Sequence, residues 1–218
     1  MKVEQINFQS VKDWMLYKHY AHRIPSISYA FGLFDGNILV GCCTFGLPPS
    51  PPLMKGAFGG KYMDIFLELN RLVVNDGLPK NTLSWFVSQC LKKLPTPMVV
   101  VSYADSAMGH HGYIYQATNW IYTGLSASRR DRDIEGVANK HSRHLFDSMG
   151  GINNALKNGI NLKLKERSRK HRYFYFLGTK KQKKEMLKNL KYKIESYPKG
   201  DNKRYDASYK PVISLTLF

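Results

Sequence analysis

Segments with strand-type and helix-type apolar periodicity alternate along the chain between Ser10 and Thr123. A strand buries every second side chain or a short apolar run, whereas a surface helix buries residues three and four positions apart. In chain order this predicts a helix Ser10–Tyr20, strands Tyr29–Phe34 and Asn37–Phe45 joined at Asp35-Gly36, a strand Asp64–Val74, a helix from Asn81 or Thr82 to Leu94, a strand Met98–Ser102, a helix Gly109–Asn119 and a strand Trp120–Thr123. Such an order is typical of an α/β protein in which one mixed sheet carries helices on its faces.

Two parts of the chain depart from this regular alternation. Leu47–Gly60 holds four prolines and three glycines, so we predict a long loop there that is functional or mobile rather than a simple connection. Beyond Ser126 we predict a short helix Ile152–Asn158, a strand Arg172–Leu177, a basic helix Lys180–Leu190 and an apolar, strand-like tail Val212–Phe218. We therefore expect a core over residues 1–125 and a basic elaboration over residues 126–218 that packs on the same sheet.

The positive charge of the chain is concentrated in its second half. The sequence has 33 Lys and Arg against 16 Asp and Glu, which gives a formal net charge of +17. Residues 1–109 contribute +3 of this charge and residues 110–218 contribute +14. Lys163–Lys193 alone holds 13 basic and two acidic residues, with aromatic residues between them. Because cations neutralise phosphates and aromatic rings stack on bases, this composition favours a nucleic acid as the partner.

The basic segment also has other interpretations. It could serve another polyanion or a membrane surface, or it could be a solvated helix face beside a strand that buries its aromatic residues. If the partner is a nucleic acid, we expect contacts from Arg167, Arg169, Lys170, Arg172, Lys180, Lys181, Lys183 and Lys184.

Several protein classes are excluded by what the sequence lacks. Its three cysteines, two of them adjacent, cannot form a disulfide framework, so we expect a reduced, intracellular protein. No apolar run reaches 18 residues and Met1–Ser10 has no signal-peptide character, so we expect neither a membrane span nor secretion. The G-x-S-x-G, P-loop, H-E-x-x-H and C-x-x-C motifs are absent. His141 and His144 have the spacing of one helix face, but a surface or DNA-facing pair is favoured over a metal site.

The segment Val99–Trp120 carries the most informative chemistry. An apolar strand is followed by a carboxylate, Asp105, then by a glycine-flanked loop and a helix that carries Tyr115. In an open α/β sheet, groups just past the carboxyl end of a strand face the crevice where ligands bind. Asp105 could accept a proton or bind a metal, and Tyr115 could donate a proton to a leaving group. The alternative is that Asp105 caps a helix and Tyr115 is a core aromatic residue.

The order of elements, ending in the run Tyr115–Gly124, resembles the GNAT N-acyltransferase fold. In that fold the comparable helix presents a tyrosine that protonates the coenzyme A thiolate as it leaves. More closely, Glu68–Leu72 (ELNRL) together with Tyr103–Gly124 resembles the Mom family of phage DNA-modification proteins, which is GNAT-related. The resemblance covers about residues 10–125 and implies a GNAT acyltransferase-like fold with a basic C-terminal elaboration.

The resemblance implies an enzyme that transfers a carbamoylmethyl group to the N6 amine of adenine in double-stranded DNA. This modification shields phage DNA from restriction enzymes in the cytoplasm of the bacterial host. The matching catalytic residues are His19, Tyr20, Arg71, Asp105 and Tyr115. The family has been proposed to hold iron, for which the carried-over ligands are His19, Tyr20, Asp105 and Tyr115; imidazole and oxygen ligands suit iron. Arg71 would orient a carboxylate or phosphate of the donor, or would pair structurally with Glu68 or Asp105.

One departure from the GNAT pattern concerns the group donor. The phosphate-binding motif Q/R-x-x-G-x-G/A is absent, and Asn75–Thr82 stands in its place, where Pro79 removes one backbone donor. The helix start could still bind an anion through its free amides. The candidate residues are Lys80, Asn81, Thr82 and Leu83. We expect the donor to be acetyl-CoA or another activated small molecule.

The physical state of the predicted substrate adds a further requirement. The adenine N6 amine is a poor nucleophile and is paired inside the duplex, so the base must be flipped or caught unpaired. Trp120, Tyr103 and Phe58 are candidates to stack on it, with core packing as the alternative for each. Two other functions stay open: a GNAT N-acyltransferase acting on a tRNA, protein or small-molecule amine, and a non-catalytic DNA-binding protein. A homodimer is also left open.

Overall fold

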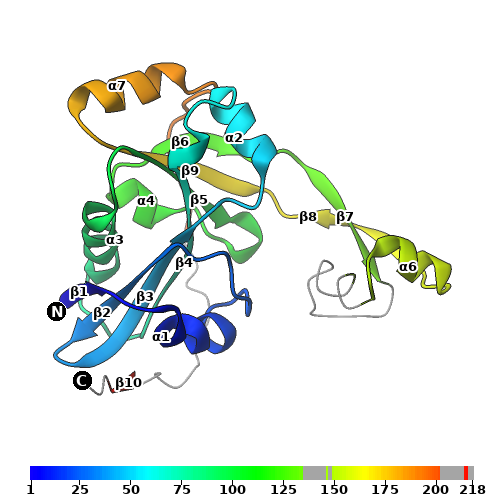
Figure 1. Ribbon diagram of the computed structural model, residues 1–218, viewed down its shortest axis with the longest axis horizontal. Coiled ribbons are helices and arrows are strands. Elements are labelled where there is room, and N and C mark those ends of the chain that lie inside the picture. The colour runs from blue at the N-terminus through cyan, green and yellow to red at the C-terminus, as the bar shows by residue number, and fades with distance from the viewer. Residues whose placement is uncertain (135–145, 147–148, 202–213, 216–218) are drawn as a thin grey trace. The chain divides into compact units, whose positions relative to one another are not determined.

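The computed structural model describes residues 1–134, 146, 149–201 and 214–215 (Figure 1). The chain divides into two compact units. One, the sheet unit, consists of Met1–Leu125 and His171–Phe218, and the other, the ribbon unit, consists of Ser126–Lys170. Residues 171–218 therefore belong to the same unit as the N-terminal part of the chain. None of the helices in the described ranges is long and apolar enough to cross a membrane.

The sheet unit is built on a mixed sheet, which has eight strands among the described residues. The strand order is β1 (Lys2–Gln5), β2 (Tyr29–Asp35), β3 (Ile38–Gly46), β4 (Phe66–Val74), β5 (Met98–Asp105), β9 (Lys170–Leu177) and β6 (Ile121–Leu125), and β10 (Ser214–Leu215) pairs with β3. The pairs β1–β2, β2–β3 and β3–β4 are antiparallel, whereas β4 and β5 are parallel. The predicted α/β class with a mixed sheet is confirmed, as is the hairpin at Asp35-Gly36, where Gly36 has a positive φ of 59°.

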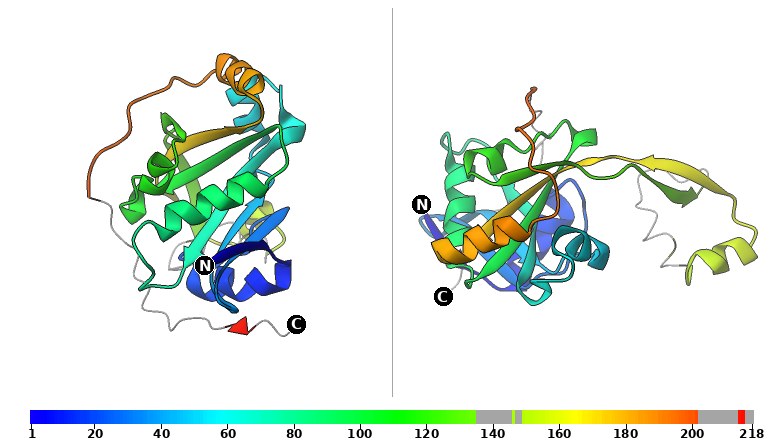
Figure 2. Two further views of the ribbon diagram at one scale, coloured as in Figure 1. Left: turned by 90° about the vertical axis from the view of Figure 1, so that its left-hand side faces the viewer. Right: turned by 90° about the horizontal axis from the view of Figure 1, so that it is seen from above.

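Helices pack on both faces of this sheet (Figure 2). Helices α3 (Thr82–Lys93) and α4 (Tyr113–Ala117) bury Phe86, Val87 and Tyr115 against one face. The other face is covered by α1 (Phe8–Asp13), α2 (Pro51–Phe58) and α7 (Lys180–Asn189). Burial of these apolar faces is the main stabilising contribution to the unit.

The predicted loop over Leu47–Gly60 is wrong, because α2 lies within it. Pro51 and Pro52 occupy the first helical turn, where a missing N–H costs no hydrogen bond. Leu53, Met54, Ala57 and Phe58 of this helix are buried, and the helix ends at Gly59, whose φ is 68°. The prolines therefore mark a helix start rather than an irregular segment. Phe58 packs among Phe66, Phe174 and Phe176, so it is a core residue and not a base-stacking one.

Two further helices differ from their predicted bounds. The first begins at Phe8, where the Asn7 carboxamide accepts from the Ser10 N–H at 3.0 Å, so Asn7 and not Ser10 is the cap. The predicted helix Gly109–Asn119 is shorter, because a 3₁₀ turn η3 (Ser106–Met108) precedes it and α4 begins at Tyr113. Glycines at 109 and 112 with positive φ separate the two.

The ribbon unit contains β7 (Arg129–Ile134), β8 (Leu162–Arg167) and α6 (Ile152–Lys157). Its strands pair antiparallel, from Arg129 opposite Arg167 to Ile134 opposite Leu162. A small apolar cluster of Ile134, Phe146 and Ala155 joins α6 to one end of the ribbon. The sequence analysis predicts α6 but not the two strands. Strand β7 is charged throughout except for Ile134, whereas Ile160, Leu162 and Leu164 alternate with polar residues at the start of β8, a strand signal that the prediction did not use.

Candidate active site

Strands β4 and β5 separate toward their carboxyl ends. Their parallel pairing runs from Phe66 opposite Val99 to Leu69 opposite Ser102, while the strands themselves continue to Val74 and Asp105. At the last pair, the Ser102 hydroxyl lies 2.8 Å from the Leu69 carbonyl oxygen and donates to it. The predicted parallel neighbours are confirmed, and the register ends where the GNAT resemblance predicts the strands to splay.

A β-bulge in β4 determines which way Arg71 points. In the pairing with β3, Thr44 is opposite Arg71 but Phe45 is opposite Leu69, so Asn70 is an extra residue. Leu69 packs in the cluster beneath α3, whereas Val73 packs in the cluster beneath α1. Without the bulge, strand alternation would place both on one face. The bulge therefore turns Arg71 to the α1 face of the sheet.

The Asn70 side chain holds this bulge. Its Oδ1 accepts from the buried Thr44 hydroxyl at 2.6 Å, and its Nδ2 donates to the Ser26 carbonyl at 2.7 Å. The Ser26 carbonyl also lies so close to Gly46 that a Cβ there would be 1.9 Å from the oxygen, so no other residue fits. The bulge within the ELNRL segment thus fixes the backbone at Ser26, in the segment that leads into β2.

We expect Asn70→Ala to lower the free energy of unfolding by about 1–3 kcal/mol, because a buried hydroxyl and a carbonyl lose their partners. It should also release Arg71 from the α1 face. Denaturant unfolding measures the first effect. Thr44→Val is the matched control, since it removes one of the two hydrogen bonds and should cost about half as much. An unchanged unfolding midpoint for Asn70→Ala would show that other contacts hold the bulge.

A π-helical turn positions His19 and Tyr20. The π-helix η1 (Trp14–Lys18) ends where the His19 N–H donates to the Trp14 carbonyl at 2.9 Å. π-Helical turns are rare in proteins, and many of those that occur lie at functional sites. His19 is buried, its Nδ1 accepts from the Ala21 N–H at 3.1 Å, and its ring stacks on Tyr20 at a centroid distance of 4.4 Å.

Charges of both signs meet at Tyr20. Burial raises the pKa of the Tyr20 phenol, the Asp105 carboxylate raises it further, and the Arg71 guanidinium lowers it. Arg71 donates to the Arg23 carbonyl at 3.2 Å and to the Asn70 carbonyl at 2.6 Å. Burial lowers the pKa of Arg71, while Tyr20 and Glu68 act to raise it. The structure thus places the predicted residues Tyr20, Arg71 and Asp105 in one electrostatic environment.

His110 is a site residue that the sequence prediction missed. Its ring packs in an edge contact with the Tyr20 ring at a centroid distance of 6.0 Å, and its backbone N–H donates to the Asp105 backbone carbonyl at 3.2 Å. Asp105 caps η3 by accepting from the Ala107 N–H at 3.0 Å, so the predicted capping role is present too. Burial lowers the pKa of His110 and the Asp105 carboxylate opposes this shift. The sequence signal that could have identified His110 is its position five residues after Asp105, the carboxylate at the end of a strand.

The lowered pKa of His110 predicts a pH dependence of stability. The unfolded imidazole titrates near its ordinary pKa of 6.5, while the folded one titrates lower. As the pH falls through this range, the unfolded state binds more protons and the protein loses stability. We therefore expect melting temperatures to fall between pH 7.5 and pH 5.5, and His110→Asn to reduce that fall. An equal fall in this variant would show that His110 does not contribute.

Tyr115 lies on the α3 face of the sheet, at the point where β4 and β5 separate. Its hydroxyl is 2.7 Å from the Ser102 hydroxyl, and its ring packs on Trp120 and Tyr173. Because the Leu69 carbonyl takes the one Ser102 proton, the Tyr115 hydroxyl must donate to Ser102. Burial raises the pKa of Tyr115 well above its usual value, although the hydrogen bond with Ser102 acts to lower it. Tyr115 therefore keeps its proton at neutral pH.

Iron at the predicted ligands His19, Tyr20, Asp105 and Tyr115 receives no support from the structure. Within the described ranges, no three His, Cys, Asp or Glu side chains converge as metal ligands would. The set His19, Tyr20, Asp105 and Tyr115 includes two phenols whose raised pKa disfavours the phenolate that binds iron. His141 and His144 lie outside the described residues. The structure gives no support for iron, and no chemical step here uses it.

The four candidate donor-binding residues lie at the start of α3. Asn81 has a positive φ of 67°, and the Thr82 N–H donates to the Pro79 carbonyl at 3.2 Å. Lys80 and Asn81 are exposed, Leu83 is half-buried and Thr82 is buried. The bond to Pro79 removes a further amide from those that an anion could use. Anion binding at this helix start stays a prediction.

The candidate DNA-binding residues fall into two groups. Arg167, Arg169 and Lys170 belong to the ribbon unit, whereas Arg172 and the four lysines of α7 belong to the sheet unit. The Arg172 guanidinium lies 3.5 Å from the Tyr192 ring centroid and donates to the Thr123 carbonyl at 2.9 Å, so it also holds β9 and β6 together. Of the other base-stacking candidates, Trp120 is fully buried and Tyr103 is half-buried.

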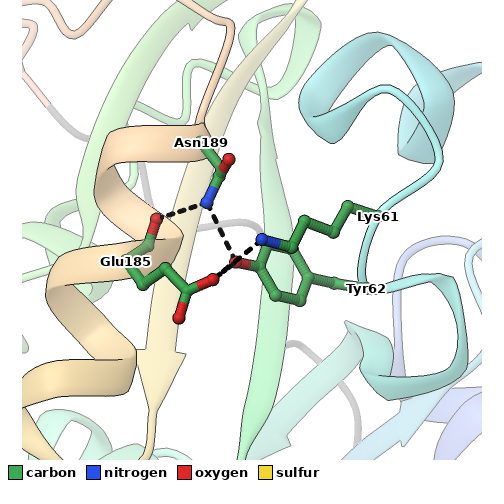
Figure 3. A network of polar contacts seen from close by, with 4 residues as sticks. All are labelled: Lys61, Tyr62, Glu185 and Asn189. Atoms are coloured by element: carbon green, nitrogen blue, oxygen red, sulfur yellow. Dashed lines mark hydrogen bonds and ion pairs between the residues drawn. The ribbon is translucent and has the colours of Figure 1, made fainter.

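Helix α7 is attached to the sheet unit through Glu185, Met186 and Asn189, and its lysines are exposed. Glu185 accepts from the Lys61 ammonium at 2.8 Å, and Asn189 donates to the Tyr62 hydroxyl at 3.1 Å (Figure 3). Met186 of the same helix is buried. The exposed lysines are Lys180, Lys181, Lys183 and Lys184. A basic surface on α7 is thus fixed by contacts that do not use its basic side chains.

Several known proteins resemble this chain. A curated relative, the methylcarbamoylase Mom of Escherichia phage Mu, is 29% identical over 210 residues, which cover 91% of this chain and 84% of the relative. Similar solved structures include an N-acetyltransferase of Staphylococcus aureus Mu50, with a TM-score of 0.46 and 11% identity over 81% of this chain and 98% of its own. A putative acetyltransferase of Salmonella typhimurium with acetyl-CoA has a TM-score of 0.45 and 10% identity over 82% and 95%. Structural likenesses this low say nothing about activity.

The family assignment comes from the sequence. The model of the Mom protein family matches residues 1–199. This range includes the ELNRL bulge, the π-helical turn and the segment from Asp105 to Tyr115. Since the match extends over far more than half of the sequence, this chain belongs to the Mom protein family.

Proposed function

We propose that this protein is a DNA-modifying transferase that attaches a carbamoylmethyl group to the N6 amine of adenine in phage DNA, and so protects that DNA from host restriction. The observation that carries the proposal is the grouping of Tyr20, Arg71, Asp105 and His110 around one set of electrostatic contacts in a Mom family member. All four side chains are half-buried, so a ligand can reach them.

The reaction requires one proton to leave the amine and one to reach the leaving group. The donor is a carbamoylmethyl group bonded through its methylene carbon to a leaving group. The adenine N6 attacks that carbon, the N–C bond forms, and the bond from carbon to leaving group breaks. Each step of proton transfer contributes about 10²–10⁴-fold when the acid and base are correctly placed.

His110 and Asp105 are the proton-accepting pair. Burial keeps His110 neutral and therefore able to accept the N6 proton, while the Asp105 carboxylate stabilises the imidazolium that results. Arg71 binds an oxygen of the donor or its developing anion. Because its guanidinium is held by two backbone carbonyls, it is oriented before the donor arrives.

Tyr115 supplies the proton for the leaving group. Its raised pKa keeps the hydroxyl protonated until an anion develops beside it. Ser102 orients that hydroxyl, which makes Ser102 a positioning residue. His19 supports the ring of Tyr20 by stacking, and the half-buried Tyr103 is the remaining candidate to stack on an unpaired adenine.

Mass spectrometry of nucleosides tests the proposal. The chain is expressed in a bacterium, plasmid DNA is digested to nucleosides, and the products are compared with those from an empty vector. We expect a deoxyadenosine heavier by one carbamoylmethyl substituent and plasmid resistant to restriction enzymes. Unmodified DNA with intact protein would contradict the proposal, and modified tRNA or protein instead would point to a different amine acceptor.

A further inference from the structure

The ribbon β7–β8 is an exposed element with little core of its own. From Lys163 to Arg167 every residue of β8 is exposed, and Leu164 is 65% exposed. Among the described residues of the ribbon unit, the apolar cluster lies at the Ile134–Leu162 end. An isolated two-stranded ribbon is marginally stable in water. Its other end therefore presents two bare faces that a partner could cover.

One face of the ribbon carries more positive than negative charge, and at one end two arginines lie directly opposite each other. The register pairs Arg129 with Arg167, Asp131 with Lys165 and Asp133 with Lys163, which sets four basic residues against two acidic ones. Like charges in direct cross-strand pairs destabilise a sheet. The Arg167 guanidinium lies 3.8 Å from Asp131, so this carboxylate stands close to Arg167 as well as opposite Lys165. This excess of positive charge is tolerated best when an anionic partner compensates it.

The other face combines arginines with an exposed leucine. Arg132 is directly opposite Leu164, and Arg130 is directly opposite Glu166, 3.8 Å from its carboxylate. An apolar side chain beside an arginine matches the edges of bases, since arginine bonds to guanine and apolar groups contact the thymine methyl. Simple binding to phosphates would not require the leucine.

We propose that the β7–β8 ribbon is a DNA-binding arm that lies in the major groove of the substrate duplex. A two-stranded ribbon has the width that the major groove admits. Arg132 and Leu164 face the bases, while Arg129, Lys163, Lys165 and Arg167 reach the phosphates along the groove walls. This inference rests on the proposed function for its choice of DNA, and it assigns the recognition of that DNA to a surface outside the candidate active site.

Fluorescence anisotropy of the full chain with a labelled 20-base-pair duplex tests the proposal without any donor. The charge variant carries alanine at Arg129, Lys163, Lys165 and Arg167. Since each lost phosphate contact removes about 0.9 from the slope of log affinity against log salt, we expect a slope shallower by about two to four. The control replaces Lys12, Lys55, Lys92 and Lys93 by alanine, which removes the same charge from exposed positions elsewhere. Its slope should stay near that of the unsubstituted protein.

A second variant separates groove binding from general attraction to anions. Leu164→Ser should lower duplex affinity about tenfold and leave the salt slope unchanged, because it removes an apolar contact and no charge. Binding to heparin should not change in this variant. Equal losses on duplex, single strand and heparin for the charge variant, with none for Leu164→Ser, would overturn the groove assignment. An unchanged slope for the charge variant would overturn the DNA role of the ribbon.

The outcomes distinguish this inference from the proposed function. Binding is measured without a donor, so a protein that modifies no adenine can still show the ribbon effect. Conversely, modified adenine in cells together with unaltered binding by both ribbon variants would retain the proposed function and reject the ribbon. Circular dichroism and melting of each variant establish that loss of binding is not loss of folding.

Discussion

Asp105→Asn is expected to reduce DNA modification by at least about 10²-fold without changing the melting temperature. The amide retains an Oδ1 that can accept from the Ala107 N–H, so the cap of η3 survives. What it loses is the negative charge that acts on Tyr20 and His110. Without that charge, the imidazolium that forms when His110 accepts the amine proton is no longer stabilised. The substitution therefore raises the free energy of the transition state and leaves the fold intact.

The measurement is the fraction of modified deoxyadenosine in plasmid DNA from cells with equal amounts of each variant. Asp64→Asn is the matched control, since Asp64 is an exposed carboxylate in the turn before β4. It should modify DNA as well as the unsubstituted chain. If Asp105→Asn also retains full modification, Asp105 is a helix cap only and the assignment of the proton-accepting pair is wrong.

Tyr115→Phe should have a comparable effect on the rate and a small one on stability. It removes one hydroxyl from a buried ring that packs on Trp120 and Tyr173, so the packing stays. If the hydroxyl protonates the leaving group, its loss costs about 10²-fold or more in rate. If it is structural, its loss costs about 1 kcal/mol of stability and leaves the rate unchanged.

Ser102→Ala separates the two roles of Tyr115. This change leaves the phenol in place but removes the hydroxyl that orients it. A proton donor that has lost its orientation should slow modification less than one that is absent, so we expect a rate between those of Tyr115→Phe and the unsubstituted chain. Full activity in both variants, with lower melting temperatures, would show that the hydrogen bonds from Tyr115 to Ser102 and from Ser102 to Leu69 are purely structural.

Much of the sheet could be predicted because its signals are local. Asp35-Gly36 predicts a hairpin from the turn chemistry of two residues, and the apolar run at Val99–Val101 predicts a buried strand. Helix α2 was missed because four prolines outweigh a short apolar face in any local interpretation. Strand β7 was missed because it is charged up to Ile134. Strand β8 was missed although Ile160, Leu162 and Leu164 alternate with polar residues, because this alternation is short.

Some residues of the candidate site could likewise be predicted from the sequence, and others could not. The carboxylate after β5 and the tyrosine of α4 stand out in the sequence, and family resemblance added His19, Tyr20 and Arg71. No sequence pattern shows that Arg71 faces Tyr20, because that depends on an extra residue in β4 opposite a partner strand 26 positions away. His110 was missed for a related reason, since its meeting with Tyr20 joins segments 90 residues apart.

The sequence by itself determined the α/β class, the basic charge of the second half, and the residue types available for proton transfer. These follow from periodicity, composition and turn chemistry, which act over a few neighbouring residues. Only the tertiary structure decided to which face of the sheet Arg71 points and that Tyr115 donates to Ser102, which donates to the Leu69 carbonyl. It also decided that the basic strands β7 and β8 pair as an exposed ribbon. Each of these depends on strand register and burial, and both are set by contacts between distant segments that no local pattern contains.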